Sequence, residues 1–169
     1  MLHNHPKIEV RPNKTDHTIL ILGWVIIGFH ALYIWFSFTK LPETIPTHFN
    51  INGEADGFGS KNTIWFVLVI NIFMYALLAF LANKMKPWSF NYPTKITVNN
   101  APQVYAMSIR MIVLLNFGIA LIFLVISVMI ITTANQDPSR MATWLFWILI
   151  ILITFGPLFP IYRMIKIPK

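Results

Sequence analysis

Four long runs of apolar residues dominate the chain, at residues 18–38, 64–82, 109–131 and 143–162. Each is close to the roughly 20 residues that a helix needs to cross a hydrocarbon core of about 30 Å. None alternates between apolar and polar positions as a barrel strand would, and hydrocarbon offers no partner to an open backbone. The pattern therefore predicts an all-α integral membrane protein, a single domain with a bundle of four transmembrane helices.

The polar segments between these runs are predicted to be the tails and loops. The first run is too long for a cleaved signal peptide, and the residues after it lack a cleavage site between small side chains. It is therefore predicted to remain as a membrane anchor. The polar segments are a tail at 1–17, a loop at 39–63, a loop at 83–108, a loop at 132–142 and a tail at 163–169.

Lys and Arg residues are distributed unevenly between these segments. Ten of the thirteen lie in or beside the two tails and the 83–108 loop, whereas the other side has only Lys40, Lys61 and Arg140. Short loops rich in Lys and Arg stay in the cytoplasm. We therefore expect a multi-pass membrane protein with both termini in the cytoplasm and the 39–63 loop outside.

Composition narrows the range of functions. The 169 residues are 56% hydrophobic and 11% charged, where about 25% charged is typical of soluble domains. This argues against a soluble enzyme, and the absence of cysteine excludes disulfides, thiolate nucleophiles and Cys-based zinc sites. The net charge of +7 is dispersed over three segments, which indicates attraction to the lipid bilayer and no nucleic-acid partner. No cofactor is predicted.

His30 lies in the middle of the first predicted span. Gly23, His30 and Ser37 are seven residues apart and share one helical stripe. Because a charged group at this depth is costly, the imidazole is expected to be neutral and to face the bundle. Since no Asp or Glu lies within a span, we interpret His30 as a hydrogen-bonding partner across the bundle. A proton relay or ligand site is the alternative.

Two asparagines are the other polar candidates inside the membrane. Asn71 and Tyr75 are four residues apart on the second span, and Asn116 shares a face of the third with Ala120 and Ser127. Such side chains commonly join helices by hydrogen bonds, each worth about 0.6 kcal/mol. Interhelical bonding is the favoured interpretation, and a substrate path is the alternative.

Two helix ends carry recognisable signals. Asn100 followed by Gln103 resembles a capping box and predicts that the third helix begins near Ala101, before the membrane. Pro157 and Pro160 each lack a backbone donor, which predicts a kink in the fourth span.

The 39–63 loop has the densest turn signals. Pro42 and Pro46 favour extended backbone, residues 47–51 alternate as a short strand does, and Asn52–Gly53 is typical of a type I′ hairpin turn. Asp56–Gly57 offers a second turn. We expect a small hairpin or compact loop over the outer mouth. The apolar residues expected to pack it onto the bundle are Phe49, Ile51 and Phe58.

The polar side chains of this loop allow several roles. The favoured interpretation is a self-satisfied loop, in which Asp56 and Asn52 bond turn amides and Lys61 pairs with a carboxylate. A calcium loop fails because Gly59 stands where the bidentate Glu belongs. Metal binding by His48 with Glu54 or Asp56, acid–base chemistry by His48, and recognition of a peptide are the alternatives. No metal site and no catalytic residue is predicted.

The same loop carries a resemblance. The run Leu41–Pro42, Ile45–Pro46, His48–Phe49, Gly53, Asp56–Gly57 and Lys61 resembles the signature of the bacterial membrane domain-of-unknown-function 1648 family. That domain also forms the N-terminal part of SdpI-like immunity proteins. A later run is similar to the family's second motif: Ile96–Thr97, Asn100–Ala101, Gln103 and Tyr105.

The resemblance implies a role in protecting a producing cell from a secreted membrane-active toxin, or in holding a repressor at the membrane. It also implies a location in the bacterial cytoplasmic (inner) membrane, and it implies no catalytic residues. The candidate binding or structural residues of the outer loop are Pro42, Pro46, His48, Asn50, Gly53, Asp56, Gly57 and Lys61.

Three functions follow as hypotheses. The first is a non-enzymatic protein of the SdpI-like type that protects against, or senses, membrane-active peptides or envelope stress through its outer loop. The second is an accessory subunit that packs against another membrane protein in a larger complex. The third is a small metal- or proton-dependent membrane enzyme or transporter that uses His48, Glu54, Asp56 and His30.

Overall fold

The computed structural model describes residues 5–168; residues 1–4 and 169, which belong to the two predicted tails, lie outside the described part. Four helical segments are long and apolar enough to cross a membrane, which confirms the predicted fold class. The first three are α1 (Lys14–Phe38), α2 (Ile64–Lys84) and α3 (Ala101–Ala134). The fourth span consists of α4 (Arg140–Phe155) followed by α5 (Leu158–Lys166).

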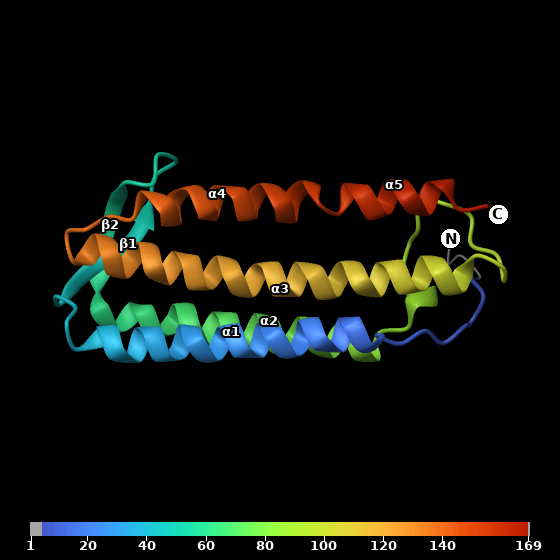
Figure 1. Cartoon of the computed structure of the whole chain (residues 1–169), viewed down its shortest axis with the longest axis horizontal. Coiled ribbons are helices and arrows are strands. Elements are labelled where there is room, and N and C mark those ends of the chain that lie inside the picture. The colour runs from blue at the N-terminus through green and yellow to red at the C-terminus, as the bar shows by residue number, and fades with distance from the viewer. Residues whose placement is uncertain (1–4, 169) are drawn as a thin grey trace.

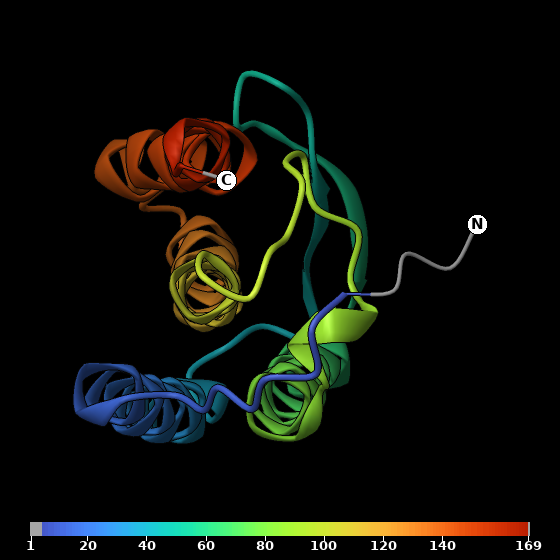
Figure 2. The same ribbon diagram turned by 90° about the vertical axis from the view of Figure 1, so that its right-hand side faces the viewer.

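Helix α3 is the centre of the bundle. It packs on α1 and α2, which lie side by side, and on α4 on its opposite side (Figures 1 and 2). Only 6% of the most apolar 18 residues of the fourth span are buried, compared with 39% of those of α3. The fourth span therefore exposes most of its surface, whereas α3 is covered from both sides.

The helix starts differ from the sequence expectation in one respect. Helix α3 begins at Ala101 as predicted, but the predicted capping box is wrong. Asn100 has helical backbone angles (φ −97°, ψ −17°), whereas a capping side chain works from extended backbone. Its carboxamide instead accepts from the Thr97 N–H at 2.9 Å and donates to the Pro168 carbonyl at 3.3 Å, which closes the preceding turn and holds the C-terminal segment.

The predicted interruption of the fourth span is present. Helix α4 ends at Phe155 and α5 begins at Leu158, so that Gly156 and Pro157 separate them. Proline lacks the N–H of a helical bond and its ring clashes with the carbonyl four residues earlier. Pro160 does not add a second break, because it lies in the first turn of α5, where helix N–H groups have no intrahelical partner.

The 39–63 loop forms a hairpin across one end of the bundle, here called the hairpin end. Strand β1 (Thr44–Phe49) pairs antiparallel with β2 (Ala55–Ser60), and the 3-10 turn η1 (Lys61–Thr63) leads into α2. The hairpin runs from the α1–α2 side of the bundle to the start of α4 (Figures 1 and 2).

The packing of the hairpin differs from the prediction. Phe49 does pack against the bundle, but Ile51 and Phe58 are 78% and 62% exposed. Ile51 lies in the turn beyond the strands, and Phe58 lies on β2, whereas β1 provides the contact with α3. Ile45, fully buried on β1, takes the place of those two residues.

The turn chemistry also differs from the prediction. A type I′ turn requires positive φ at both central residues, but of Asn52 and Gly53 only Gly53 has it (φ +80°). The Gly53 N–H donates to the Asn50 carbonyl and the Asn50 N–H to the Glu54 carbonyl, both at 2.9 Å, which defines a three-residue loop closed by a left-handed glycine. Asp56–Gly57 lies inside β2 and forms no second turn.

The opposite end of the bundle, here called the tail end, holds the 85–100 loop and both described chain ends (Figure 1). A 3-10 turn η2 (Pro87–Ser89) begins this loop, and the Tyr92 hydroxyl donates to the Pro87 carbonyl at 2.9 Å. Burial raises the pKa of Tyr92 to about 12. The loop is thus a folded cover over this end of α3.

Candidate functional site

The structure divides the predicted site residues between two places. The motif residues from Pro42 to Lys61 lie at the hairpin end. His30, Asn71 and Asn116 lie inside the bundle, where all three are fully buried. His30 is eight residues from the end of α1, which is roughly 12 Å along a helix axis, so the two groups are separate sites.

His48 and Asp56 form a pair on the hairpin surface. The His48 Nδ1 contacts the Asp56 carboxylate, and the two side chains are 73% and 45% exposed. The strand register is irregular on both sides of His48, and such a bulge re-aims side chains. A Cβ on Gly57 would lie 2.9 Å from the His48 Cβ, so the glycine leaves room for the histidine.

The hairpin tip is organised by Asn50. Its Oδ1 accepts from the N–H groups of Asn52 at 2.9 Å and Glu54 at 3.0 Å, and its Nδ2 donates to the Glu54 carboxylate at 3.0 Å. The predicted side-chain bonds from Asn52 and Asp56 to turn amides are therefore wrong, because Asn50 occupies those amides. A Cβ on Gly53 would lie 2.4 Å from the Thr143 Cγ2, which places the tip directly against α4.

Lys61 and the two prolines hold the base of the hairpin. Lys61 pairs with a carboxylate, as predicted: its Nζ donates to the Glu43 Oε1 at 2.8 Å and its N–H to the Glu43 carbonyl at 2.9 Å. The ammonium also lies 5.3 Å from the centre of the Phe38 ring. Pro46 is buried in β1, and Pro42 is exposed in the connection from α1. These residues position the hairpin and leave little of Lys61 available to a ligand.

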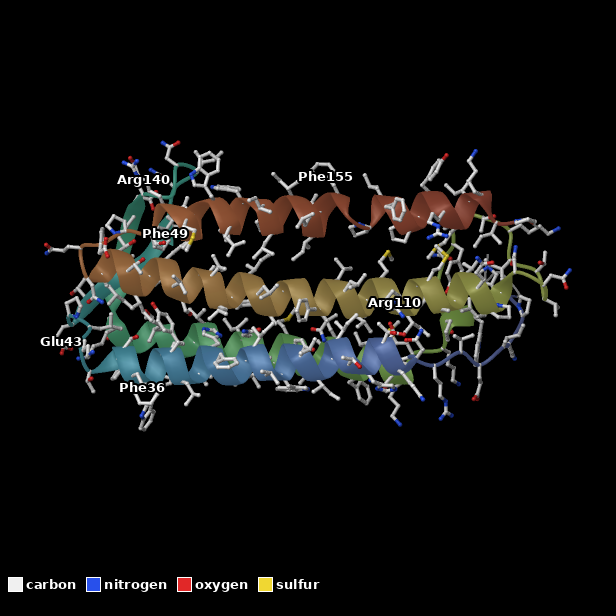
Figure 3. All side chains as sticks on the ribbon, viewed as in Figure 1. Phe36, Glu43, Phe49, Arg110, Arg140 and Phe155 are labelled. Atoms are coloured by element: carbon white, nitrogen blue, oxygen red, sulfur yellow. The ribbon has the colours of Figure 1, made fainter. Side chains whose placement is uncertain are left out.

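A groove of about 610 Å³ lies between the hairpin tip and the beginning of α4. Ile51 and Glu54 line it from the tip, and Arg140, Trp144 and Trp147 line it from α4. Figure 3 shows Arg140 at the end of α4 that adjoins the hairpin. The groove thus combines exposed apolar surface with one acid and one base on opposite walls. The sequence did not predict it, because its two walls are about ninety residues apart.

His30 joins three helices inside the bundle. Its Nδ1 accepts from the Asn71 Nδ2 of α2 at 3.0 Å, and its Nε2 lies 2.7 Å from the Ser127 Oγ of α3. Because Nδ1 accepts, the hydrogen-bond network assigns the proton to Nε2, so His30 is a neutral imidazole. The predicted bond across the bundle is present, with Asn71 and Ser127 as the partners.

The two asparagines fill the seam between α2 and α3. Asn71 also donates to the Ala120 carbonyl at 3.4 Å, and Asn116 donates to the Tyr75 carbonyl at 3.2 Å. The Oδ1 atoms of both asparagines are buried without a protein partner. The Tyr75 hydroxyl donates to the Leu20 carbonyl at 2.8 Å, so α1 and α2 are joined there as well.

An ion pair at the tail end was not predicted. Arg110 of α3 contacts the carboxylate of Asp16, whose side chain is 5% exposed, and also donates to the Asn13 Oδ1 at 3.0 Å. Asn13 and Asp16 form the capping box of α1, so Arg110 ties the start of that helix to α3. The signal in the sequence is Asn-x-x-Asp directly before an apolar run, together with an arginine at the edge of another.

The metal alternative has only a partial set of ligands. His48 with Asp56 provides one nitrogen and one carboxylate, and Glu54 bonds to Asn50 instead. Among residues 5–168, no group of three His, Asp or Glu side chains is arranged to hold a metal ion.

These features define a class: a multi-pass membrane protein with four spans, a hairpin between the first two, and a neutral hydrogen-bonded core. Residues 25–72 match the family described as Domain of unknown function (DUF1648). The chain therefore carries this domain, as the hairpin motif predicted. The matched residues include the end of α1, the whole hairpin and the first part of α2, and so contain His30, His48 and Asn71.

A relative in Archaeoglobus fulgidus, described as an uncharacterized protein, is 40% identical over 50 residues. The aligned part is 30% of this chain and 27% of the relative, so the chain spans about a quarter of that protein's length. No solved structure matches the chain.

Proposed function

We propose that this chain is a non-enzymatic inner-membrane protein of the SdpI-like type. Its hairpin end faces outward and binds an amphipathic peptide or an envelope component, in protection against membrane-active peptides or in sensing envelope stress. The observation that carries the proposal is the groove between the hairpin tip and α4.

The groove suits an amphipathic peptide. Trp144 is 71% exposed and Ile51 78% exposed, so both offer apolar surface to a ligand, and tryptophan is among the residues that most often dominate the binding energy of an interface. Glu54 and Arg140 offer opposite charges on the two walls, which suits a peptide with charged groups on one side and apolar groups on the other. The tip is held by Asn50 and seated on Thr143, so the groove exists before a ligand arrives.

The outward orientation of the hairpin end is part of the proposal. Among residues 5–168, nine of the twelve Lys and Arg residues lie at or beside the tail end. Four of the six acids lie at the hairpin end. Because Lys and Arg set the orientation whereas Asp and Glu contribute little, the basic tail end is the observation that supports cytoplasmic termini.

The intramembrane core supports a structural role for His30. Its two ring nitrogens are both engaged by neutral partners, and no carboxylate within residues 5–168 contacts it. A proton relay requires a chain of exchangeable groups that reaches water. The contacts of His30 end at Asn71 and Ser127, both fully buried.

Survival of cells challenged with a synthetic cationic amphipathic peptide tests the proposal. Cells that produce the chain are expected to survive higher peptide concentrations than cells with an empty vector, and Ile51→Ser with Trp144→Ala is expected to abolish the difference. Phe66→Ala, a change of an exposed aromatic on α2 outside the groove, is the matched control. Equal survival with and without the chain, and unchanged envelope-stress transcription, would remove the proposal.

A second candidate, an accessory subunit of a larger membrane complex, is favoured by a separate observation. The fourth span packs mainly on α3, and only 6% of its most apolar 18 residues are buried. Co-purification in mild detergent tests it: a stable partner whose association is lost on substitution of exposed α4 residues such as Ile148 would support it. Isolation of the wild type without any stoichiometric partner would contradict it.

A further inference from the structure

A second cavity, here called the basic pocket, lies at the tail end of the bundle. It has a volume of about 580 Å³ and forms where the N-terminal segment passes over the end of α2. Figure 2 faces this end and shows that segment crossing from α1 to the end of α2. The basic pocket is therefore at the opposite end from the hairpin groove and plays no part in the proposed function.

Three cations line the basic pocket. Arg11 comes from the N-terminal segment, Lys84 from the last turn of α2, and Lys86 from the loop that follows. The acid in the lining is Glu9, which lies 3.5 Å from Arg11 in a pair whose side chains are 74% and 82% exposed. Exposed pairs of this kind are weak, so the pocket keeps a net positive charge available to an anion.

Apolar surface continues from the basic pocket into the membrane. His17 lines the pocket, and Ile21 and Trp24 follow it on α1 at spacings of four and seven residues, which places them on one stripe. Ile21 is 63% exposed and Trp24 44% exposed. Trp88 also lines the pocket, and an indole with a polar N–H is typical of the headgroup level.

We propose that the basic pocket binds the phosphate of an anionic phospholipid, with an acyl chain along the Ile21–Trp24 stripe of α1. Cations that converge on one cavity at the end of a membrane span suit a phosphodiester at headgroup depth. A soluble phosphate would share the same cations but would make no use of the apolar stripe.

Native mass spectrometry of the full chain, released from nanodiscs with equal amounts of phosphatidylglycerol and phosphatidylcholine, tests the proposal. The wild type is expected to retain phosphatidylglycerol in preference to phosphatidylcholine. Lys84→Gln with Lys86→Gln is expected to reduce that retention by about tenfold or more, since each cation at the surface strengthens attraction to anionic lipid. The matched control is Lys7→Gln with Lys95→Gln, two exposed lysines outside the pocket.

A variant that is expected to bind more phosphatidylglycerol tests whether the losses in the lysine variants come from misfolding. Glu9→Gln removes the acid that lines the pocket and is expected to increase retention of phosphatidylglycerol. Equal retention of the two lipids by the wild type, or an equal loss in the Lys84/Lys86 and Lys7/Lys95 variants, would overturn the proposal. Displacement of phosphatidylglycerol by millimolar inorganic phosphate, without any dependence on Ile21→Ser, would assign the pocket to a soluble phosphate and likewise overturn it.

Discussion

Individual side chains in the bundle core have specific partners, and this makes them sensitive to substitution. His30 bonds to Asn71 and Ser127, and Tyr75 bonds to the Leu20 carbonyl beside Gly23. Hydrocarbon provides no water to replace a lost partner, so removal of one member leaves another unsatisfied. A few specific hydrogen bonds in the core therefore hold three helices together.

The first prediction concerns His30. Replacement of His30 by Ala should lower the free energy of unfolding by about 2–3 kcal/mol, because it opens a cavity and removes the partners of Asn71 and Ser127. Titration with sodium dodecyl sulfate, followed by tryptophan fluorescence, measures this. His17→Ala, at an exposed position on the same helix, is the control and should change stability little. An equal effect of the two substitutions would contradict the role assigned to His30.

Gly23 gives a second prediction with a control on the same helix. A Cβ there would lie 2.0 Å from the Tyr75 Oη, so Gly23→Ala must displace Tyr75 and should cost about 1–3 kcal/mol in the same unfolding assay. A Cβ at Gly28 meets nothing within 4 Å, so Gly28→Ala should be neutral or stabilising. Equal changes in the free energy of unfolding for the two substitutions would contradict the close approach of α1 and α2 at Gly23.

The elements are joined by contacts at their ends as well as along their lengths. Arg110 ties the capping box of α1 to α3, Lys61 of η1 bonds to Glu43 just before β1, and Gly53 seats the hairpin tip on α4. The apolar surfaces of the helices face either one another or lipid, and such surfaces do not by themselves fix the position of one helix along the axis of the next. The contacts at the helix ends therefore matter.

A double-mutant cycle tests the tie between α1 and α3. Arg110→Gln leaves the buried Asp16 carboxylate without its cation and should destabilise the chain by about 2 kcal/mol. The further change Asp16→Asn should recover part of that loss, giving a coupling energy of about 1 kcal/mol or more. Additive effects of the two substitutions would show that the pair contributes nothing specific.

The hairpin seat gives a prediction at the opposite end. Gly53→Ala would clash with Thr143 and would place a side chain at φ +80°. Both effects should release the tip from α4 and raise amide hydrogen exchange across 50–54, with the helices unchanged. The control is Asn52→Ala: Asn52 has no positive φ, so this substitution should leave hydrogen exchange in β1 and β2 nearly unchanged. Unchanged exchange in Gly53→Ala would contradict the seat.

The molecule as a whole is asymmetric in charge and in packing. Its tail end is strongly basic and its hairpin end carries most of the acids, while one of its four spans remains largely uncovered. The excess of Lys and Arg at one end predicts an orientation in the membrane, and the uncovered span leaves a side of the bundle for lipid or another protein.

Orientation is directly testable because the chain has no cysteine. Asn52→Cys at the hairpin tip should react with a membrane-impermeant thiol reagent in intact cells, whereas Asn91→Cys in the 85–100 loop should react only after the membrane is permeabilised. The reverse pattern would place the hairpin groove in the cytoplasm and remove the proposed function, but it would leave the basic pocket untouched.

Much of this organisation could be read from the chain alone. The helices follow from apolar length, because α1 and α2 end where hydrophobic runs end, and the break at Pro157 follows from a missing N–H. The hairpin followed from its turn residues, and a neutral His30 from the cost of charge in hydrocarbon. These are consequences of local chemistry and of the surrounding lipid.

Other features depend on which distant segments meet, and no local pattern specifies this. The pairing of Asp16 with Arg110, the choice of Ser127 as the partner of His30, and the groove between Ile51 and Trp144 each join parts of the chain about ninety residues apart. In lipid, apolar faces of helices are nearly equivalent to one another, so shape and a few polar contacts select the neighbours. Those contacts exist only once the helices have packed.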